Sequence, residues 1–460
     1  MWKYLVVFVL FAAAAGAGAA WVLASRAPGP VIAITGSEAI GQTGELDVAI
    51  ETPGGELKSL EVTLEQDDTT LPIFSLARGG AAELVREDEN RVSLSEELGR
   101  RRFEDLREGQ ARIVVTAVRP VLFGYREVAS TATRDIEVRL RPPLLGAQSQ
   151  FHYVNHGGSE MVVYRVTPAD ADSGVRVGDV EYPGFPASGA GIESADPALH
   201  VAFFALLWNQ DLDTPIRLYA RDKLGNEGSA SFDYRTFEKQ FRASKINLSD
   251  SFLSRVVPPI LQNSTDFRVK DPTDYLASYL EINGEMRREN DAYIAELSKK
   301  TAPEILWRGA FKQLINTAVE SGFADQRDYI YDGKVVDHQT HLGFDLASTT
   351  AAPVLAANRG RIVHAGWLGI YGNCVIVDHG MGLQSLYAHL SQIDVRVGDM
   401  VETDTQLGRS GSTGLAGGDH LHFTMLLSGH AVTPIDWWSS QWVEDRIMRK
   451  IHEAGDRAGP

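Results

Sequence analysis

Four side chains near the carboxyl end of this 460-residue chain have the types and spacing needed to bind a metal ion. His341 and Asp345 lie four positions apart, and His420 and His422 lie two positions apart. Both offsets are even, so on extended strands the two members of each pair project from the same face. Two such strands side by side would bring imidazoles and a carboxylate to one point. Catalytic zinc usually takes three protein ligands and keeps a fourth position open, so these side chains predict a zinc centre.

The residues around these two pairs make the pattern more specific than either pair alone. Gly343 and the Ala-Ser-Thr-Thr run after Leu346 disfavour a helix across the first pair. Five further segments follow in order: 371–380 (YGNCVIVDHG), 386–391 (LYAHLS), 397–401 (VGDMV), 408–414 (GRSGSTG) and 419–423 (DHLHF).

With these segments in this order, the chain resembles the LytM/lysostaphin-type zinc metallopeptidases, which cut peptide bonds in bacterial cell-wall peptidoglycan. The resemblance runs from Trp307 to Trp438. It implies a compact, mostly antiparallel β domain with one zinc ion at the floor of a groove. It also implies two sets of site residues: zinc ligands at His341, Asp345 and His422, and catalytic histidines that do not bind the metal at His389 and His420.

The chemistry of these residue types agrees with the implied roles. Two neutral imidazoles and one carboxylate leave Zn²⁺ with a net positive charge, which polarises a scissile carbonyl and activates water. Histidine has a reference pKa of about 6.5, so it can take or give a proton near neutral pH. His389 and His420 are therefore candidates for the general base and for the group that steadies the oxyanion. The sequence does not divide these two roles between them.

Other residues near the pattern have simpler interpretations. Asn373 orients a loop beside the groove or is only a turn residue after Gly372. Cys374 lies in an apolar run and reads as a core residue rather than a nucleophile. The remaining histidines of the region are interpreted as structural or surface groups: His338, His364, His379 and His430.

The amino end of the chain predicts export. Tyr4 to Ala24 is an apolar run long enough to cross a bilayer core of about 30 Å at about 1.5 Å per residue. Lys3 precedes it, which favours an amino terminus in the cytoplasm. A cleaved signal peptide is the alternative, because small residues such as Ala17 and Ala19 offer a cleavage site. We favour an uncleaved anchor, since the apolar run exceeds a usual signal core of about 7–15 residues.

Composition narrows the class of partner. The formal net charge of −17 argues against nucleic acid or an anionic membrane surface as the main partner. A single cysteine excludes an internal disulfide framework, which a bacterial periplasmic protein does not need. A hydrophobic content of 44% supports packed globular domains rather than disorder.

We predict a multi-domain, mostly β protein with an N-terminal transmembrane helix and two β-sandwich modules resembling immunoglobulin domains. A helical linker then leads into a C-terminal antiparallel β metallopeptidase domain. The predicted parts are an anchor or signal segment (1–30), an immunoglobulin-like module (31–142), a second β module (143–236), the linker (237–325), the zinc peptidase domain (326–440) and a tail (441–460).

Periodicity supports these parts. Apolar residues alternate around Val48, Val62 and Val138, as expected for strands with one buried face. The more charged segment 83–108 predicts a short helix or a long loop. Asp274 can cap a helix that runs toward Lys299, and a second short helical or turn segment is expected around Phe311. The tail from Gln441 is charged and helical in character. Position alone suggests that the linker inhibits the enzyme by lying over its groove, and a plain packing role is the alternative.

The predicted function is a zinc endopeptidase that cuts peptidoglycan cross-links, with D-Ala to meso-diaminopimelate links favoured over pentaglycine bridges. Its predicted location is the bacterial cell envelope, as a single-pass inner-membrane protein with a periplasmic catalytic domain. The β modules are rigid spacers or bind cell-wall or division proteins. One alternative is a non-catalytic activator of cell-wall amidases with the same fold, and another is a scaffold with an idle peptidase fold. The complete ligand set argues against both.

Overall fold

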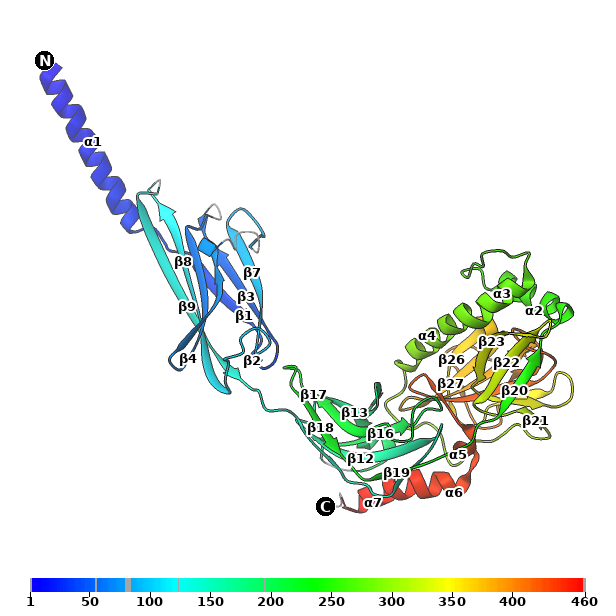
Figure 1. The fold of residues 1–460 in the computed structure, drawn as a ribbon. Helices are drawn as coiled ribbons and strands as arrows, with labels where there is room; N and C mark the ends of the chain where they lie inside the picture. The colour runs from blue at the N-terminus through cyan, green and yellow to red at the C-terminus, as the bar shows by residue number, and fades with distance from the viewer. Residues whose placement is uncertain (1, 54–55, 79–83, 123, 194–195, 458–460) are drawn as a thin grey trace. The chain divides into compact units, whose positions relative to one another are not determined.

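The computed structural model describes residues 2–53, 56–78, 84–122, 124–193 and 196–457 (Figure 1). Strands dominate the described residues, and the C-terminal domain is built on antiparallel strands, so the predicted mostly β class is confirmed. The chain forms two compact units. The first contains residues 1–142 with 221–227, and the second contains residues 143–220 with 228–460.

The first unit begins with helix α1 (Trp2–Ser25). Its apolar stretch Trp2–Ala24 is long enough to cross a membrane, although a signal sequence would meet the same criterion. Two sheets follow and enclose one core. The first contains β1 (Val31–Gly36), β3 (Gly44–Glu51), β7 (Arg91–Leu98) and β6 (Val85–Arg86). The second contains β2 (Ala39–Ile40), β9 (Arg126–Val138), β8 (Gly109–Val121), β4 (Ser59–Gln66) and β5 (Thr69–Ser75).

The strands expected around Val48, Val62 and Val138 are present, and all three side chains are buried. The expectation of a short helix or a long loop for 83–108 was wrong for residues 85–86 and 91–98, which are strands, whereas residues 99–108 form a loop. Strand β7 forms because Val92 and Leu94 alternate with polar residues and join the core beside those of β3, its neighbour in the sheet.

The second unit begins with a β module of three small sheets. One contains β10 (Leu144–Ala147), β12 (Ser159–Thr167), β16 (Leu199–Ala205) and β15 (Phe185–Pro186). Another contains β14 (Val180–Pro183), β13 (Asp172–Val177), β17 (Ile216–Arg221) and β18 (Glu227–Ser231). The third is the parallel pair β11 (His152–Asn155) and β19 (Tyr234–Phe237). The apolar run from Val201 forms the fully buried strand β16, as expected.

The C-terminal domain is built on a large, mainly antiparallel sheet in the order β21 (Ala318–Ser321), β24 (Phe344–Ala347), β32 (Leu421–Leu427), β28 (Leu383–Leu390), β27 (Asn373–Gly380), β26 (Gly360–Trp367) and β30 (Met400–Val401), with β33 (His430–Val432) beside β32. Every residue of β28 and β32 is buried, so both faces of the sheet centre are covered. Two three-stranded sheets flank it: β20 (Ala243–Asn247), β22 (Asp325–Tyr331) and β23 (Lys334–His341), and β25 (Pro353–Leu355), β31 (Gln406–Arg409) and β29 (Gln392–Ile393).

The segment before this domain is only partly helical. Its helices are α2 (Asp250–Asn263), α3 (Tyr275–Glu281) and α4 (Arg287–Ser298), and a π-helical turn, η5 (Ile282–Met286), joins the last two. Asp274 accepts a hydrogen bond from the Ala277 amide at 3.0 Å and caps α3, as expected. The segment around Phe311 contains no helix and is irregular, with bends at residues 309–310 and 315–316. Phe311 packs against both Trp307 and Trp437.

The tail forms α6 (Ser440–Val443), a π-helical turn, η7 (Glu444–Met448), and α7 (Arg449–Arg457), after the short helix α5 (Pro434–Trp438). It packs on the second β module through a buried ion pair. Lys450 Nζ lies 2.7 Å from Glu160 Oε1 and donates to the Met161 carbonyl at 2.8 Å. The tail therefore ties the β module and the C-terminal domain into one unit.

Candidate active site

The strands bring His341, Asp345 and His422 to one point. His341 ends β23, Asp345 lies in β24, and His422 lies opposite Asp345 on the antiparallel neighbour β32. His341 Nε2 is 2.9 Å from Asp345 Oδ1 and 3.0 Å from His422 Nδ1, and His422 Nδ1 is 3.0 Å from the same carboxylate oxygen. Among the described residues, this His-Asp-His group has ligand atoms close enough together to hold a metal ion.

In His341 and His422, the ring nitrogen that faces away from the group makes a hydrogen bond. This bond shows that the other nitrogen is available to bind a metal. His341 Nδ1 donates to the carbonyl of Gly322 at 2.9 Å, so His341 Nε2 keeps a lone pair. The Thr424 hydroxyl donates to the carbonyl of Leu342 at 3.0 Å. Thr424 Oγ1 therefore accepts from His422 Nε2 at 3.0 Å, which leaves His422 Nδ1 without a proton.

This arrangement fits a cation. Two lone pairs and a carboxylate oxygen face one another with no hydrogen between them, and a positive ion at their centre would remove the repulsion. Burial lowers the pKa of His422 to about 4, so the ring is neutral and available as a ligand at neutral pH. Imidazole nitrogen and carboxylate oxygen are ligands that zinc binds at about 2.0–2.2 Å.

Gly343 has a role at the site that the sequence pattern did not reveal. A Cβ atom at Gly343 would lie 2.5 Å from Thr424 Oγ1 and 2.6 Å from His422 Nε2. A residue with a side chain at position 343 would therefore disrupt the hydrogen bond between Thr424 and His422. The position of Gly343 between the candidate ligands His341 and Asp345 could have pointed to this close contact. From the sequence, Gly343 was interpreted only as a residue that disfavours a helix.

Arg327 is a second site residue that sequence reasoning missed. Its Nη2 donates to Asp345 Oδ2 at 3.2 Å and to Ser321 Oγ at 2.7 Å, and its side chain is largely buried. The guanidinium therefore fixes the carboxylate oxygen that does not contact the two imidazoles. The sequence carried no signal for this contact because the strand pairing of β22 and β23 creates it.

His389 and His420 lie beside the His-Asp-His group, with ring centroids 4.9 Å apart. His389 Nδ1 donates to the carbonyl of Thr413 at 2.7 Å. His420 Nδ1 donates to the carbonyl of Gly418 at 2.9 Å, and its Nε2 is 3.4 Å from Asp345 Oδ1. In each ring Nδ1 is used for orientation, so Nε2 is the nitrogen that remains for chemistry. All five residues proposed from the sequence thus lie at one site.

The two rings differ in their surroundings. Burial, with the neighbouring His420 and His422, holds the pKa of His389 well below its ordinary value. Burial also lowers the pKa of His420, but the hydrogen bond and charge of Asp345 outweigh this effect and raise it. His389 has a φ of +61°, a left-handed conformation that is uncommon for a residue with a side chain.

A cavity of about 170 Å³ lies over the His-Asp-His group. One wall comes from the C-terminal domain and includes Tyr371 and Leu415. The other comes from α2, α3, η5 and α4, which we call the helical cover, through Phe252, Tyr279, Asn283 and Arg287. Figure 1 shows this cover against the strands of the domain, and Tyr279 packs on Tyr329 of β22.

Polar contacts hold the helical cover in place. Asn283 Nδ2 donates to Asp337 Oδ2 at 2.7 Å. Arg255 Nη2 donates to the carbonyl of Gly417 at 2.9 Å, three residues before His420. The helical cover therefore contacts both the hairpin of β22 and β23 and the loop that leads to His420 and His422.

Other residues considered from the sequence lie outside the His-Asp-His group. Both nitrogens of His379 are bonded, to the Arg359 carbonyl at 2.8 Å and to Ser385 Oγ at 2.7 Å. Asn373 Nδ2 donates to the Leu390 carbonyl at 3.1 Å, next to His389. The remaining candidates have these surroundings: His338 pairs with Asp328, His364 contacts Tyr293, His430 lies against Tyr182, and Cys374 is fully buried.

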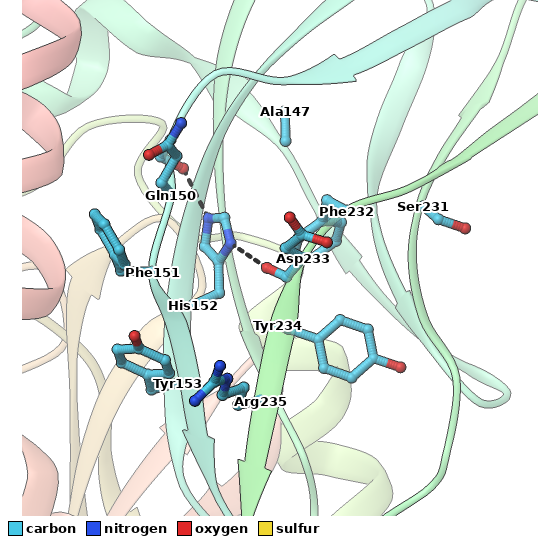
Figure 2. A pocket seen from close by; sticks show the side chains of 11 residues that line it. Ala147, Gln150, Phe151, His152, Tyr153, Ser231, Phe232, Asp233, Tyr234 and Arg235 are labelled. Carbon is cyan, nitrogen blue, oxygen red and sulfur yellow. Dashed lines mark hydrogen bonds between the residues drawn. The ribbon is translucent and has the colours of Figure 1, made fainter.

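A larger cavity of about 730 Å³ lies on the second β module, lined by residues of β11 and β19 and of the segments that precede these strands (Figure 2). Its buried histidine, His152, bonds to Ser149 Oγ at 2.9 Å and to the Asp233 carbonyl at 2.8 Å. Neither ring nitrogen is left for a metal or a substrate. The cavity is therefore a weaker candidate for catalysis than the smaller one over the His-Asp-His group.

Comparison with known proteins agrees with this choice. Residues 339–434 match the model of peptidase family M23. The chain thus contains a domain of peptidase family M23, and the resemblance noted from the sequence is confirmed.

The relatives each cover part of this chain. Peptidoglycan DD-endopeptidase ShyB of Vibrio cholerae is 24% identical over 47% of this chain and 58% of its own length. DD-carboxypeptidase/endopeptidase Mpg of Neisseria meningitidis is 39% identical over 21% of this chain and 22% of its own length. The solved catalytic domain of lysostaphin from Staphylococcus simulans is 29% identical, with a TM-score of 0.24 over 28% of this chain and 98% of that domain. The chain thus spans little more than half of the first relative and less of the second.

Proposed function

We propose that this protein is a zinc-dependent endopeptidase that hydrolyses peptide cross-links of bacterial peptidoglycan. The observation that carries the proposal is the His-Asp-His group, in which hydrogen bonds fix both imidazoles with their lone pairs facing one carboxylate oxygen. One zinc ion per catalytic domain, held by His341, Asp345 and His422, would supply Lewis-acid chemistry for a peptide carbonyl and lower the pKa of water to about 7.

The residues around that position would position the reactants and move protons. His389 Nε2 and His420 Nε2 point from rings already oriented by backbone carbonyls, so each can accept a proton or donate one at that atom. One ring would take the proton of the attacking water at Nε2. The other ring, protonated at Nε2, would donate a hydrogen bond to the carbonyl oxygen as charge develops on it. Arg327 would keep Asp345 in place throughout.

The proposed substrate class rests on the family and on the relatives. Family M23 comprises peptidases, and the two relatives above are named as endopeptidases, ShyB and Mpg. We therefore propose cross-links between D-Ala and meso-diaminopimelate as the target, with pentaglycine bridges as the less favoured one. Cleaving such cross-links would permit wall remodelling or cell separation.

The amidase-activating alternative is not favoured. A regulator with this fold does not need metal ligands, whereas here Gly343, Thr424 and Arg327 all support the ligands and no described contact displaces one. An idle peptidase domain in a scaffold protein is disfavoured for the same reason.

We also propose the cellular setting. Helix α1 would anchor the protein in the inner membrane, and the rest of the chain would lie in the periplasm with the peptidoglycan. The β modules would act as spacers or bind cell-wall or division proteins.

The test is digestion of purified sacculi by the full-length protein in detergent, with the products identified by mass spectrometry. We expect cross-linked muropeptide dimers to fall and monomers to rise. Chelation should stop this change, and added zinc should restore it. If intact sacculi resist the protein while an added amidase becomes more active, the regulator replaces the enzyme.

A further inference from the structure

The hairpin of β8 and β9 in the first unit extends beyond the sheet that holds it. Strand β4 pairs with β8 only as far as Ser59, which lies opposite Val118. Strands β8 and β9 continue pairing to Val121 and Arg126. Three residues at about 3.3 Å each carry the end of the hairpin about 10 Å past β4. We call the described residues 121–122 and 124–126 the hairpin tip.

The hairpin lies beside the carboxyl end of helix α1. The Arg126 guanidinium is 5.3 Å from the ring centroid of Trp21, and its Nη1 lies 3.5 Å from the Trp21 carbonyl oxygen. Arg119 Nε donates to the carbonyl of Pro28 at 2.9 Å, which fixes the chain just after the helix. Figure 1 shows the end of the hairpin next to the end of α1.

The contact with Trp21 sets the height of the tip relative to a bilayer. Trp21 is four residues before the end of α1, which corresponds to about 6 Å along the helix axis. The 24 residues of α1 span about 36 Å, so they cross a hydrocarbon core of about 30 Å and reach the interface. Trp is enriched at that interface, so Arg126 reaches the same level.

The tip has the composition of an interfacial segment. Its residues are Val121, Leu122, Gly124, Tyr125 and Arg126, and the Tyr125 side chain is 82% exposed. Tyrosine places an apolar ring and a polar hydroxyl in the two environments that meet at a membrane surface. Arg26, Arg119 and Arg126 make this end locally basic in a chain whose formal net charge is −17.

We infer that the hairpin tip is a membrane-binding element that inserts Tyr125 into the headgroup region of the bilayer crossed by α1. The inference rests on α1 being an anchor, and it is independent of the proposed enzyme activity. The helix and the tip together would give the first β module two points of attachment to the membrane. Two points would restrict its tilt, which a single flexible anchor would not.

The test uses the full-length protein in vesicles of phosphatidylethanolamine and phosphatidylglycerol. A polarity-sensitive fluorophore is attached at Tyr125→Cys and, in a matched variant, at Asp68→Cys. Asp68 is exposed in the turn between β4 and β5, at the opposite end of the same sheet. The native cysteine, Cys374, is fully buried. Labelling of the unsubstituted protein measures how much fluorophore Cys374 takes up.

Lipids with a quencher in the headgroup region should quench the probe at 125 at least several-fold more than the probe at 68. Equal, weak quenching at both positions would overturn the inference. So would a probe at 125 that is shielded from water-soluble and lipid quenchers alike, because that result would mean contact with another protein. Neither outcome depends on whether the protein digests peptidoglycan.

Discussion

Two kinds of buried histidine occur in this protein. Their hydrogen bonds distinguish structural histidines from those that are available for catalysis. His379 in the C-terminal domain and His152 in the second β module each use both ring nitrogens in hydrogen bonds. His389 and His420 are also buried, but each bonds a backbone carbonyl through Nδ1, and His420 Nε2 faces the Asp345 carboxylate at 3.4 Å. Burial alone therefore does not mark a functional histidine. A functional histidine is marked instead by a ring that one hydrogen bond orients and whose other nitrogen faces the His-Asp-His group.

The largest effect is expected when a proposed metal ligand is replaced. His422→Ala should abolish zinc binding and reduce sacculus digestion about a thousand-fold or more, since metal activation is worth several kcal/mol and each 1.36 kcal/mol is about tenfold. Metal content measured by mass spectrometry and digestion rate check this. His379→Asn is the matched control, because His379 is equally buried but lies outside the His-Asp-His group. Loss of bound zinc in the control, with its fold intact, would contradict the distinction.

Substituting the two non-ligand histidines should separate chemistry from metal binding. His389→Ala and His420→Ala should each lower the digestion rate by about 10²–10⁴-fold, the usual contribution of a general acid or base. Both variants should keep one zinc ion, because neither ring belongs to the His-Asp-His group. Near-normal digestion by both variants would remove these residues from the proposed mechanism.

Support of a ligand should matter less than the ligand itself. Thr424→Val removes the hydroxyl that accepts from His422 Nε2 and should weaken zinc affinity by about 10–100-fold. Competition with a chelator of known affinity measures this. Ser385→Ala, which removes the hydroxyl beside His379, is the control and should leave zinc affinity unchanged. Equal affinities in both variants would show that the outer hydrogen bond does not orient the ligand.

The smallest effect concerns access to the site. Asn283→Ala removes the 2.7 Å hydrogen bond from the helical cover to Asp337, so we expect digestion to rise a few-fold if the cover restricts the cavity. The exposed Glu289→Ala change on α4 is the control. Unchanged or lower digestion in Asn283→Ala, with unchanged stability, would favour a plain packing role for the cover.

Residue spacing predicted that neighbouring strands bring His341, Asp345 and His422 to one point, and Asp345 and His422 do lie opposite each other on β24 and β32. The expectation that His341 and Asp345 share one extended strand was wrong, because His341 ends β23 and Asp345 lies on the separate strand β24. The cap at Asp274 was predictable because it depends on neighbours within one turn. Arg327 and the left-handed backbone of His389 were not, since strand register and tertiary packing determine them. Strand β7 was missed because its charged residues masked the alternation of Val92 and Leu94. The expected helix around Phe311 is absent because aromatic packing on Trp437 holds an irregular segment there.

The most direct test of the central claim is a time course with one purified cross-linked muropeptide dimer as substrate. The full-length protein carrying one zinc ion is compared with His420→Ala carrying the same amount of zinc. We predict that the unsubstituted protein splits the dimer at the D-Ala to meso-diaminopimelate bond and that His420→Ala does so at least a hundred-fold more slowly. A dimer that stays intact with the zinc-loaded, folded protein would contradict the account.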